Sequence, residues 1–249
     1  ALVSIMHVNN EIGTVADLQG IYNTVKRINP STLFHSDGVQ GFCKTPFGAL
    51  PADLYTISGH KFHAPKGVGA LLLRKGVKNA GGVMGGGQER GLRSGTTNAP
   101  GIIAMGKSLE IMQQDYAEKL ERMRACKMRL WENLRRLDGV VLNGPDPRDS
   151  APHLLNVSFL GIRGEVLLHA LEAKEIYVST GSACSSPKKG SNRILAAIGV
   201  TGERAQGAIR FSLCPYNTIE EMDIVAEYLL RYENMDAKTF EQVFTDPAA

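Results

Sequence analysis

The chain has 249 residues, of which 43% are hydrophobic and 21% are charged, and its formal net charge is +3. This length allows one large domain or two smaller ones with a sizeable core. The weakly basic balance does not indicate nucleic acid, and neither a long Lys/Arg run nor an apolar run of about 18 residues is present. We therefore expect no direct nucleic-acid partner and no membrane partner.

The four cysteines, Cys43, Cys126, Cys184 and Cys214, lie far apart in the sequence. They form no C-x-x-C pair and have no histidines at zinc-ligand spacing, so no metal site is expected. Sparse cysteines in a long chain also argue against a disulfide framework. We expect a reducing, cytoplasmic setting and interpret Cys126 as a small buried hydrophobic residue.

Apolar runs alternate with segments of helical periodicity, which is typical of an α/β protein with a largely parallel sheet. Strands are expected near residues 2–7, 32–36, 54–57 and 68–74, and helices at 17–28, 101–113 and 118–137. The first segment reads as a buried strand, as in a chain that begins as a fragment. The texture changes near residue 115, which predicts one domain at 1–115 and a second, C-terminal α/β domain at 116–249.

In the C-terminal domain, the helix at 118–137 carries one stripe toward a core: Leu120, Met123, Lys127, Leu130, Leu134 and Leu137, with Trp131 also placed in the core. A strand at 154–160, a helix at 165–173 and a strand and turn at 208–218 follow. Thr218 and Glu221 have the T-x-x-E spacing of a capping box, so the last helix should begin there.

The stretch "SGHKFHAPKG" at 58–67 follows an apolar run and brings Ser58, His60 and Lys61 together. A strand-end lysine can form a Schiff base with an aldehyde cofactor, while a hydroxyl and an imidazole can hold its phosphate. Taken alone, the signal is weak. A lone lysine is more often a solvated surface charge, and Ser58 and His60 could simply be turn residues.

A second apolar strand ends in Asp37 in "TLFHSDGVQ". Sites in parallel sheets form outside the carboxyl ends of neighbouring strands, so Asp37 should lie near Lys61. A carboxylate there could pair with a pyridinium nitrogen. Asn10 and Gln40 could add amide hydrogen bonds. Loop capping by Asp37 and ordinary turn chemistry for the two amides are the alternatives.

Two further residues have unusual surroundings. Cys184 lies on the flexible loop "STGSACSSPKKG" beside two lysines, which favours an exposed, partly ionised thiol over a harmless loop thiol. Arg210 interrupts the apolar run "AIRFSL". It should meet either a structural carboxylate or the carboxylate of a substrate, which it can bind through two parallel hydrogen bonds. A glycine-rich segment at 81–98 permits tight turns but no regular interior.

Six motifs, "HVNNEIG", "HSDGVQ", "SGHKFHAPKGVGAL", "GGGQERGLRSGTTN", "STGSACSS" and "AIRFSL", together resemble the pyridoxal-phosphate-dependent cysteine desulfurases. These enzymes form part of the class V aminotransferase group of fold type I. The loop after Cys184 resembles that of the branch serving iron–sulfur assembly. The resemblance covers residues 1 to roughly 230. It implies a large cofactor-binding domain, N-terminally incomplete, and a small domain carrying the cysteine loop.

The resemblance also implies a role for each matched position. Lys61 would hold the cofactor pyridoxal 5'-phosphate and act as general base, and Cys184 would accept sulfur. The remaining matched residues would bind cofactor or substrate: Asp37 the pyridine nitrogen, Gln40 the phenolic oxygen, Ser58 and His60 the phosphate, Thr96 the phosphate across a homodimer interface, Asn10 the cofactor or substrate, and Arg210 the substrate carboxylate.

The implied reaction converts L-cysteine to L-alanine and leaves a persulfide on Cys184 for a sulfur-acceptor protein such as an iron–sulfur scaffold. The chain departs from the family in lacking its usual first third, in Gly38 where alanine is common, and in Cys214 where glycine is usual. The alternatives are a selenocysteine lyase, another class V aminotransferase, or a catalytically incompetent fragment.

Overall fold

The computed structural model describes residues 1–46, 49–78, 81–180 and 192–230. Residue contacts divide the chain into two compact units. The first comprises Ala1–Val8 and Val15–Tyr116, and the second comprises Asn9–Thr14 and Ala117–Ala249. The chain thus enters the second unit briefly, returns to the first, and passes into the second again after Tyr116.

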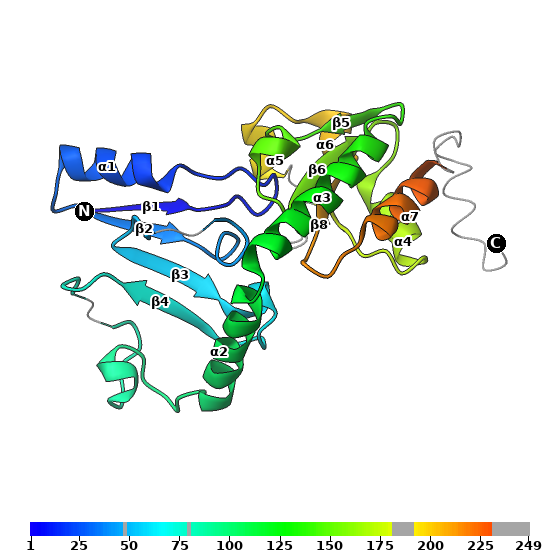
Figure 1. Ribbon diagram of the computed structural model, residues 1–249. Coiled ribbons are helices and arrows are strands. Elements are labelled where there is room, and N and C mark those ends of the chain that lie inside the picture. Colours follow the sequence, from blue (N-terminus) through cyan, green and yellow to red (C-terminus); the bar gives the residue numbers. More distant parts are fainter. Residues whose placement is uncertain (47–48, 79–80, 181–191, 231–249) are drawn as a thin grey trace. The chain divides into compact units, whose positions relative to one another are not determined.

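The first unit is built on a four-stranded sheet in the order β1-β2-β3-β4. Its strands are β1 (Leu2–Met6), β2 (Leu33–Asp37), β3 (Leu54–Ser58) and β4 (Gly69–Leu73). The first three strands run parallel and β4 is antiparallel to β3 (Figure 1). Met6 lies opposite Asp37, and Asp37 lies opposite Thr56. The predicted α/β class with a mainly parallel sheet is confirmed in this unit.

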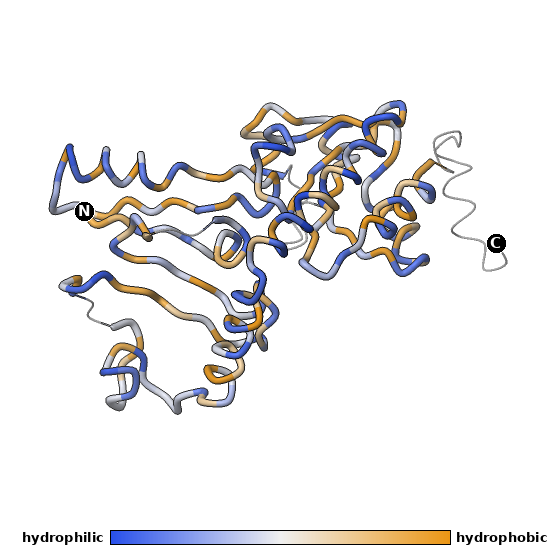
Figure 2. The backbone as a smooth tube through the Cα atoms, in the orientation of Figure 1, coloured by the Kyte–Doolittle hydropathy of each residue, from blue (hydrophilic) through white to orange (hydrophobic). Residues whose placement is uncertain are grey.

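Helix α1 (Leu18–Ile28) packs on one face of this sheet. Asp17 caps its first turn by accepting a hydrogen bond of 3.0 Å from a backbone amide. Leu18 shares a core cluster with Phe34 of β2 and Tyr55 of β3. Hydrophobic and hydrophilic residues alternate along α1 in Figure 2, as expected of a helix with one apolar side. Two short helical turns and one long helix complete the unit: η1 (Gly59–Phe62), η2 (Gln88–Gly91) and α2 (Ala99–Gln113).

Strand β1 corrects one expectation. It was predicted to be buried, but Leu2 is 58% exposed and Met6 is 37% exposed. Val3 and Ile5 point the other way and pack against the cluster under α1. Because successive side chains of a strand face opposite sides, only one face of β1 is covered within the described residues.

The second unit holds an antiparallel sheet in the order β5-β6-β8-β7. Its elements are α3 (Tyr116–Leu134), β5 (Val140–Leu142), η3 (Pro147–Asp149), β6 (Leu154–Phe159), α4 (Gly164–Glu172), β7 (Ser179–Thr180), α5 (Arg193–Ala197), α6 (Gly202–Gln206), β8 (Ala208–Ser212) and α7 (Ile219–Leu230). Helices α3, α4 and α7 share one apolar core with β6 and β8.

Several predictions about this unit are confirmed. The stripe on α3 is buried from Met123 onward and includes Lys127, whereas Trp131 is only partly buried. The capping box forms at α7: Glu221 N donates to Thr218 Oγ1, and Thr218 N donates to a Glu221 carboxylate oxygen. Separately from these predictions, the described ranges of both units contain no helix with the length and apolarity needed to cross a membrane.

Candidate active site

The carboxyl ends of β2 and β3 bring two of the predicted residues to one edge of the sheet. Asp37 is the last residue of β2, and Ser58 is the last residue of β3. The parallel register pairs Asp37 with Thr56, so Ser58 lies two residues further along the neighbouring strand. Polar side chains at such a strand-end edge line a binding crevice in open α/β sheets.

A single turn of 3₁₀ helix, η1, follows β3 and carries the next two predicted residues. Ser58 Oγ and His60 Nδ1 are hydrogen-bonded at 2.9 Å, and Lys61 is half-buried. The turn is anchored by Phe62, which is buried with Met112 of α2 and whose carbonyl accepts a hydrogen bond from a serine of α2. The hydroxyl, imidazole and ammonium groups are therefore presented from one well-packed turn.

Positive charge surrounds His60. Its pKa is lowered by partial burial and then by the nearby ammonium groups of Lys61, Lys66 and Lys44. Each of these effects disfavours a further positive charge on the ring. A cluster of cationic groups beside a hydroxyl and an imidazole suits a phosphate or another anion.

The turn after β2 presents Asp37 and Gln40. Val39 N donates to Asp37 Oδ1 at 3.0 Å, and Gly38 N donates to the Thr56 carbonyl at 2.9 Å. Gln40 is buried, with 9% of its surface exposed. The turn is thus fixed both by its own aspartate and by the adjacent strand β3.

Two further predicted residues, Asn10 and Arg210, belong to the second unit. Arg210 lies in β8 and donates from Nη1 to the Asn10 carbonyl at 3.0 Å and from Nε to Ser212 Oγ at 3.2 Å. The loop that holds Asn10 is also bound by Asn156 of β6, whose side-chain amide donates to the Glu11 carbonyl at 3.1 Å. The structure therefore joins these two predicted residues in one hydrogen-bonded group.

The remaining predicted site residues are Thr96 and Cys184. Thr96 is exposed, and its carbonyl accepts a hydrogen bond of 3.1 Å from Arg93. Cys184 lies outside the described residues. Cys126 is fully buried, as predicted, and Cys43 is buried with a positive φ of 60°. Burial raises the pKa of the Cys43 thiol to about 11, which makes it a poor nucleophile.

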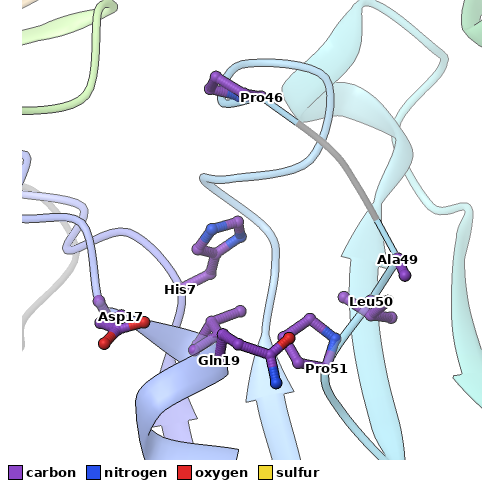
Figure 3. Close-up of a pocket in the computed structure, with 9 residues that line it drawn as sticks. His7, Asp17, Gln19, Pro46, Ala49, Leu50 and Pro51 are labelled. Carbon is purple, nitrogen blue, oxygen red and sulfur yellow. The ribbon is translucent and has the colours of Figure 1, made fainter.

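Sequence reasoning did not assign a role to His7 or Tyr55. His7 follows β1, and its Nδ1 is hydrogen-bonded to the Tyr55 hydroxyl at 2.8 Å. His7 also lines a pocket of about 230 Å³ that none of the predicted residues lines. The pocket wall includes Asp17, Gln19, Pro46, Ala49, Leu50 and Pro51 (Figure 3). The period of two along β1 and β3 places His7 with Val3 and Ile5, and Tyr55 with Ile57, but it does not show which face α1 covers.

Comparison with known proteins identifies the family to which the chain belongs. The model of the class-V aminotransferase family matches residues 1–225, so the chain belongs to that family. It is 42% identical over 230 residues to the cysteine desulfurase IscS of Escherichia coli strain K12 / DH10B, covering 91% of this chain and 56% of the relative.

Solved structures show the same similarity. A NifS-like protein has a TM-score of 0.82 and 42% identity, over 93% of this chain and 60% of that one. A NifS-like protein from Rickettsia africae has the same TM-score and 28% identity, over 94% of this chain and 62% of that one. The fold is that of the pyridoxal-phosphate enzymes of fold type I. The chain spans little more than half the length of the curated relatives it matches.

Proposed function

We propose that this chain is part of a pyridoxal-phosphate-dependent cysteine desulfurase, which converts L-cysteine to L-alanine and receives the sulfur as a persulfide on Cys184. The observation that carries the proposal is the convergence of Asp37 with the Ser58–Lys61 turn at one sheet edge. Membership of the class-V aminotransferase family supports it. In this proposal the first unit is the cofactor-binding domain and the second is the small domain.

The donor set at the sheet edge fits pyridoxal phosphate. Ser58 and His60 supply a hydroxyl and an imidazole for the phosphate, within the positive field of Lys61 and its neighbours. Lys61 Nζ would hold the aldehyde carbon, and Asp37 would accept a hydrogen bond from the protonated pyridine nitrogen. When bound, the cofactor would supply an electron sink for the bonds at the substrate Cα. Gln40 would bind the phenolic oxygen.

The chain's own groups then bind the substrate and move its protons. Arg210 binds the carboxylate of L-cysteine, with Asn10 held beside it. Lys61 takes the Cα proton as general base. The Cys184 thiolate attacks the substrate sulfur: an S–S bond forms, the Cβ–S bond breaks, and its electron pair passes to Cβ, which takes up the proton of the substrate thiol. Lys61 then returns its proton to Cα, which gives alanine. No external oxidant is required.

A homodimer fits the exposed surface of the first unit. Met84 is 101% exposed and Val83 is 53% exposed in the glycine-rich segment, and Ile103 on α2 is 72% exposed. Apolar side chains of this size on adjoining segments suit coverage by a second copy. In that arrangement Thr96, from the same segment, would reach the phosphate bound to the partner.

The sulfur carried by Cys184 implies an acceptor protein, for which an iron–sulfur scaffold is the proposed example. A persulfide survives only where thiols are not driven to disulfides, so the proposed location is the cytoplasm. The described cysteines Cys43, Cys126 and Cys214 are free thiols.

The test is the visible absorption spectrum of the chain with pyridoxal phosphate, before and after L-cysteine is added. We expect a band that changes with L-cysteine and is lost in Lys61→Ala but retained in Lys75→Ala, an exposed lysine just after β4. Alanine release should then be lost in Cys184→Ser and retained in Cys214→Ser.

Other results would point elsewhere. A band with alanine release from selenocysteine but not from cysteine would favour a selenocysteine lyase. Amino-group transfer that does not need Cys184 would favour another aminotransferase. A spectrum that Lys61→Ala does not change would contradict the proposal and favour a catalytically incompetent chain.

A further inference from the structure

A hydrogen-bonded pair lies beneath the turn that presents Asp37 and Gln40. His7 Nδ1 and the Tyr55 hydroxyl are 2.8 Å apart. His7 is 9% exposed and Tyr55 is fully buried in the cluster under α1. Burial lowers the pKa of His7 and, together with the nearby Asp37 carboxylate, raises the pKa of Tyr55. Both side chains are therefore neutral near pH 7, which suits a buried hydrogen bond.

The turn touches this pair through two glycines. A Cβ added at Gly38 would overlap Cζ, Cε1 and Oη of Tyr55, all closer than the 3.0 Å that Cβ atoms essentially never show. A Cβ added at Gly41 would overlap the imidazole of His7 in the same way. The phenol and the imidazole thus lie directly against the backbone of the turn.

Space, and not backbone conformation, requires these glycines. Neither Gly38 nor Gly41 has a positive φ, so an alanine could adopt either backbone conformation. The side chains of Tyr55 and His7 exclude it, because their atoms occupy the space of the added Cβ. The bulk of Tyr55 therefore explains the glycine at position 38.

We propose that Tyr55 and His7 are positioning residues that set the height and tilt of the turn carrying Asp37 and Gln40. The inference rests on the proposed function, in which the side chains of Asp37 and Gln40 bind the cofactor ring. Asp37 directly precedes Gly38, and Gln40 directly precedes Gly41, so each cofactor residue is next to one supported glycine. A shift of the turn would move the carboxylate and the amide together.

The test is a mutant cycle at positions 38 and 55 in the full chain. Gly38→Ala forces the turn away from Tyr55. Tyr55→Leu removes the atoms that would overlap the new Cβ. In the double variant the turn should therefore return toward its wild-type position. Gly106→Ala in α2 is the matched control, since a Cβ there meets nothing within 4 Å.

The first readout is a titration with pyridoxal phosphate. It measures the cofactor concentration at which the visible absorption band reaches half of its maximal absorbance. We expect Gly38→Ala to raise it about tenfold or more, and the double variant to lie within about threefold of Tyr55→Leu alone. Gly106→Ala should match the wild type. A folded Gly38→Ala chain that binds the cofactor like the wild type would overturn the proposal, as would additive effects of the two substitutions.

The second readout isolates the hydrogen bond. Tyr55→Phe keeps the ring against Gly38 and removes only the hydroxyl, whereas Tyr22→Phe makes the same change in the same core cluster. We expect Tyr55→Phe, but not Tyr22→Phe, to move the pH midpoint of the bound-cofactor band. Identical pH profiles for the two variants would show that the His7–Tyr55 bond does not position the turn.

A third readout needs no cofactor and separates this inference from the proposed function. Amide hydrogen exchange over residues 37–42 should quicken in Gly38→Ala and return to the Tyr55→Leu rate in the double variant. If the wild type gives no visible band but exchange follows this pattern, the function fails and the positioning relation stands. Unchanged exchange in Gly38→Ala would overturn it whatever the spectrum shows.

Discussion

Arg210 donates a hydrogen bond of 3.0 Å to the backbone carbonyl of Asn10, although the two residues are 200 positions apart in the sequence. This hydrogen bond holds Nη1 of the guanidinium, and a second one, from Nε to Ser212 Oγ of β8, holds Nε. Together they fix the orientation of the planar group. A guanidinium held in this way is preorganised for a carboxylate, because less rotamer freedom is lost on binding.

We expect Arg210→Lys to raise the KM for L-cysteine about tenfold or more and to lower kcat by less. A lysine keeps the charge but loses both the two-pronged carboxylate contact and the bond to the Asn10 carbonyl. Steady-state alanine release measures both constants. Arg129→Lys, which alters a surface ion pair with Asp223, is the control. An unchanged KM in Arg210→Lys would argue against a substrate-binding role.

Asp53 should make the first unit sensitive to acid. It is 4% exposed, accepts from Phe34 N at 2.8 Å, and pairs with Lys26 at 2.6 Å and Arg74 at 3.4 Å. Burial opposes ionisation, but the Lys26 and Phe34 hydrogen bonds and the two cationic charges together lower the pKa of the carboxyl.

The pH dependence follows from that direction. The lowered pKa adds stability above the unfolded-state value, and this stability is lost as the pH falls through the folded-state value. We expect Asp53→Asn to lose about 2 kcal/mol at pH 7 and to show a shallower decline below pH 4. Urea unfolding at several pH values measures this. Equal acid sensitivity of the two proteins would contradict the assignment.

Lys127 should make the stability of the second unit depend on pH in the alkaline range. It is fully buried on α3 and donates to Ser150 Oγ and to the Ala151 carbonyl, each at 2.9 Å. Burial lowers its pKa from 10.5 to about 8. The unfolded chain therefore binds more protons than the folded chain between these values, so stability rises with pH across that window.

We expect the wild type to gain up to about 3 kcal/mol relative to Lys127→Met between pH 8 and 10.5. Lys107→Met, at an exposed position, should leave the slope of the wild type unchanged. Parallel stability curves for the wild type and Lys127→Met would show that the ammonium is not desolvated as the structure indicates.

A buried amide pair should be energetically coupled. Asn143 and Asn156 are each 1% exposed, and Asn143 Nδ2 donates to Asn156 Oδ1 at 2.8 Å. Arg204 donates to Asn143 Oδ1 at 3.0 Å, and Asn156 donates to the Glu11 carbonyl, so the chain of bonds reaches the Asn10 loop.

We expect Asn143→Ala and Asn156→Ala each to lower the free energy of unfolding by about 2 kcal/mol, because each leaves buried partners unsatisfied. The double variant should lose less than the sum by about 1 kcal/mol. Chemical denaturation of the four proteins measures the coupling. Strictly additive losses would mean that the two amides do not act as a pair.

The sequence predicted the elements whose periodicity is long or whose ends carry polar signals. The stripe on α3 and the capping box at Thr218 are examples, as is the meeting of Asp37 with Ser58 at one sheet edge. Short elements such as β5 and β7 escaped prediction because two or three residues cannot show a period.

Support beneath the site could not be predicted in the same way. That Gly38 rests on Tyr55 depends on how neighbouring strands pair, and the sequence records neither the register nor which face is covered. The exposure of Leu2 escaped prediction for the same reason, since an apolar run alone does not show whether one or both faces of a strand are packed.

The brief excursion at Asn9–Thr14 means that the second unit is not a continuous stretch of the chain. Ile12 completes a small core with Leu195 and Val200, and the Gly13 carbonyl accepts a hydrogen bond of 2.9 Å from Ala151. A polypeptide beginning at Ala117 would lack the Asn9–Thr14 segment, and the apolar side chains that pack against Ile12 would be exposed to solvent. Any recombination of this unit with a foreign partner must therefore carry the Asn9–Thr14 segment along, or supply a replacement for it.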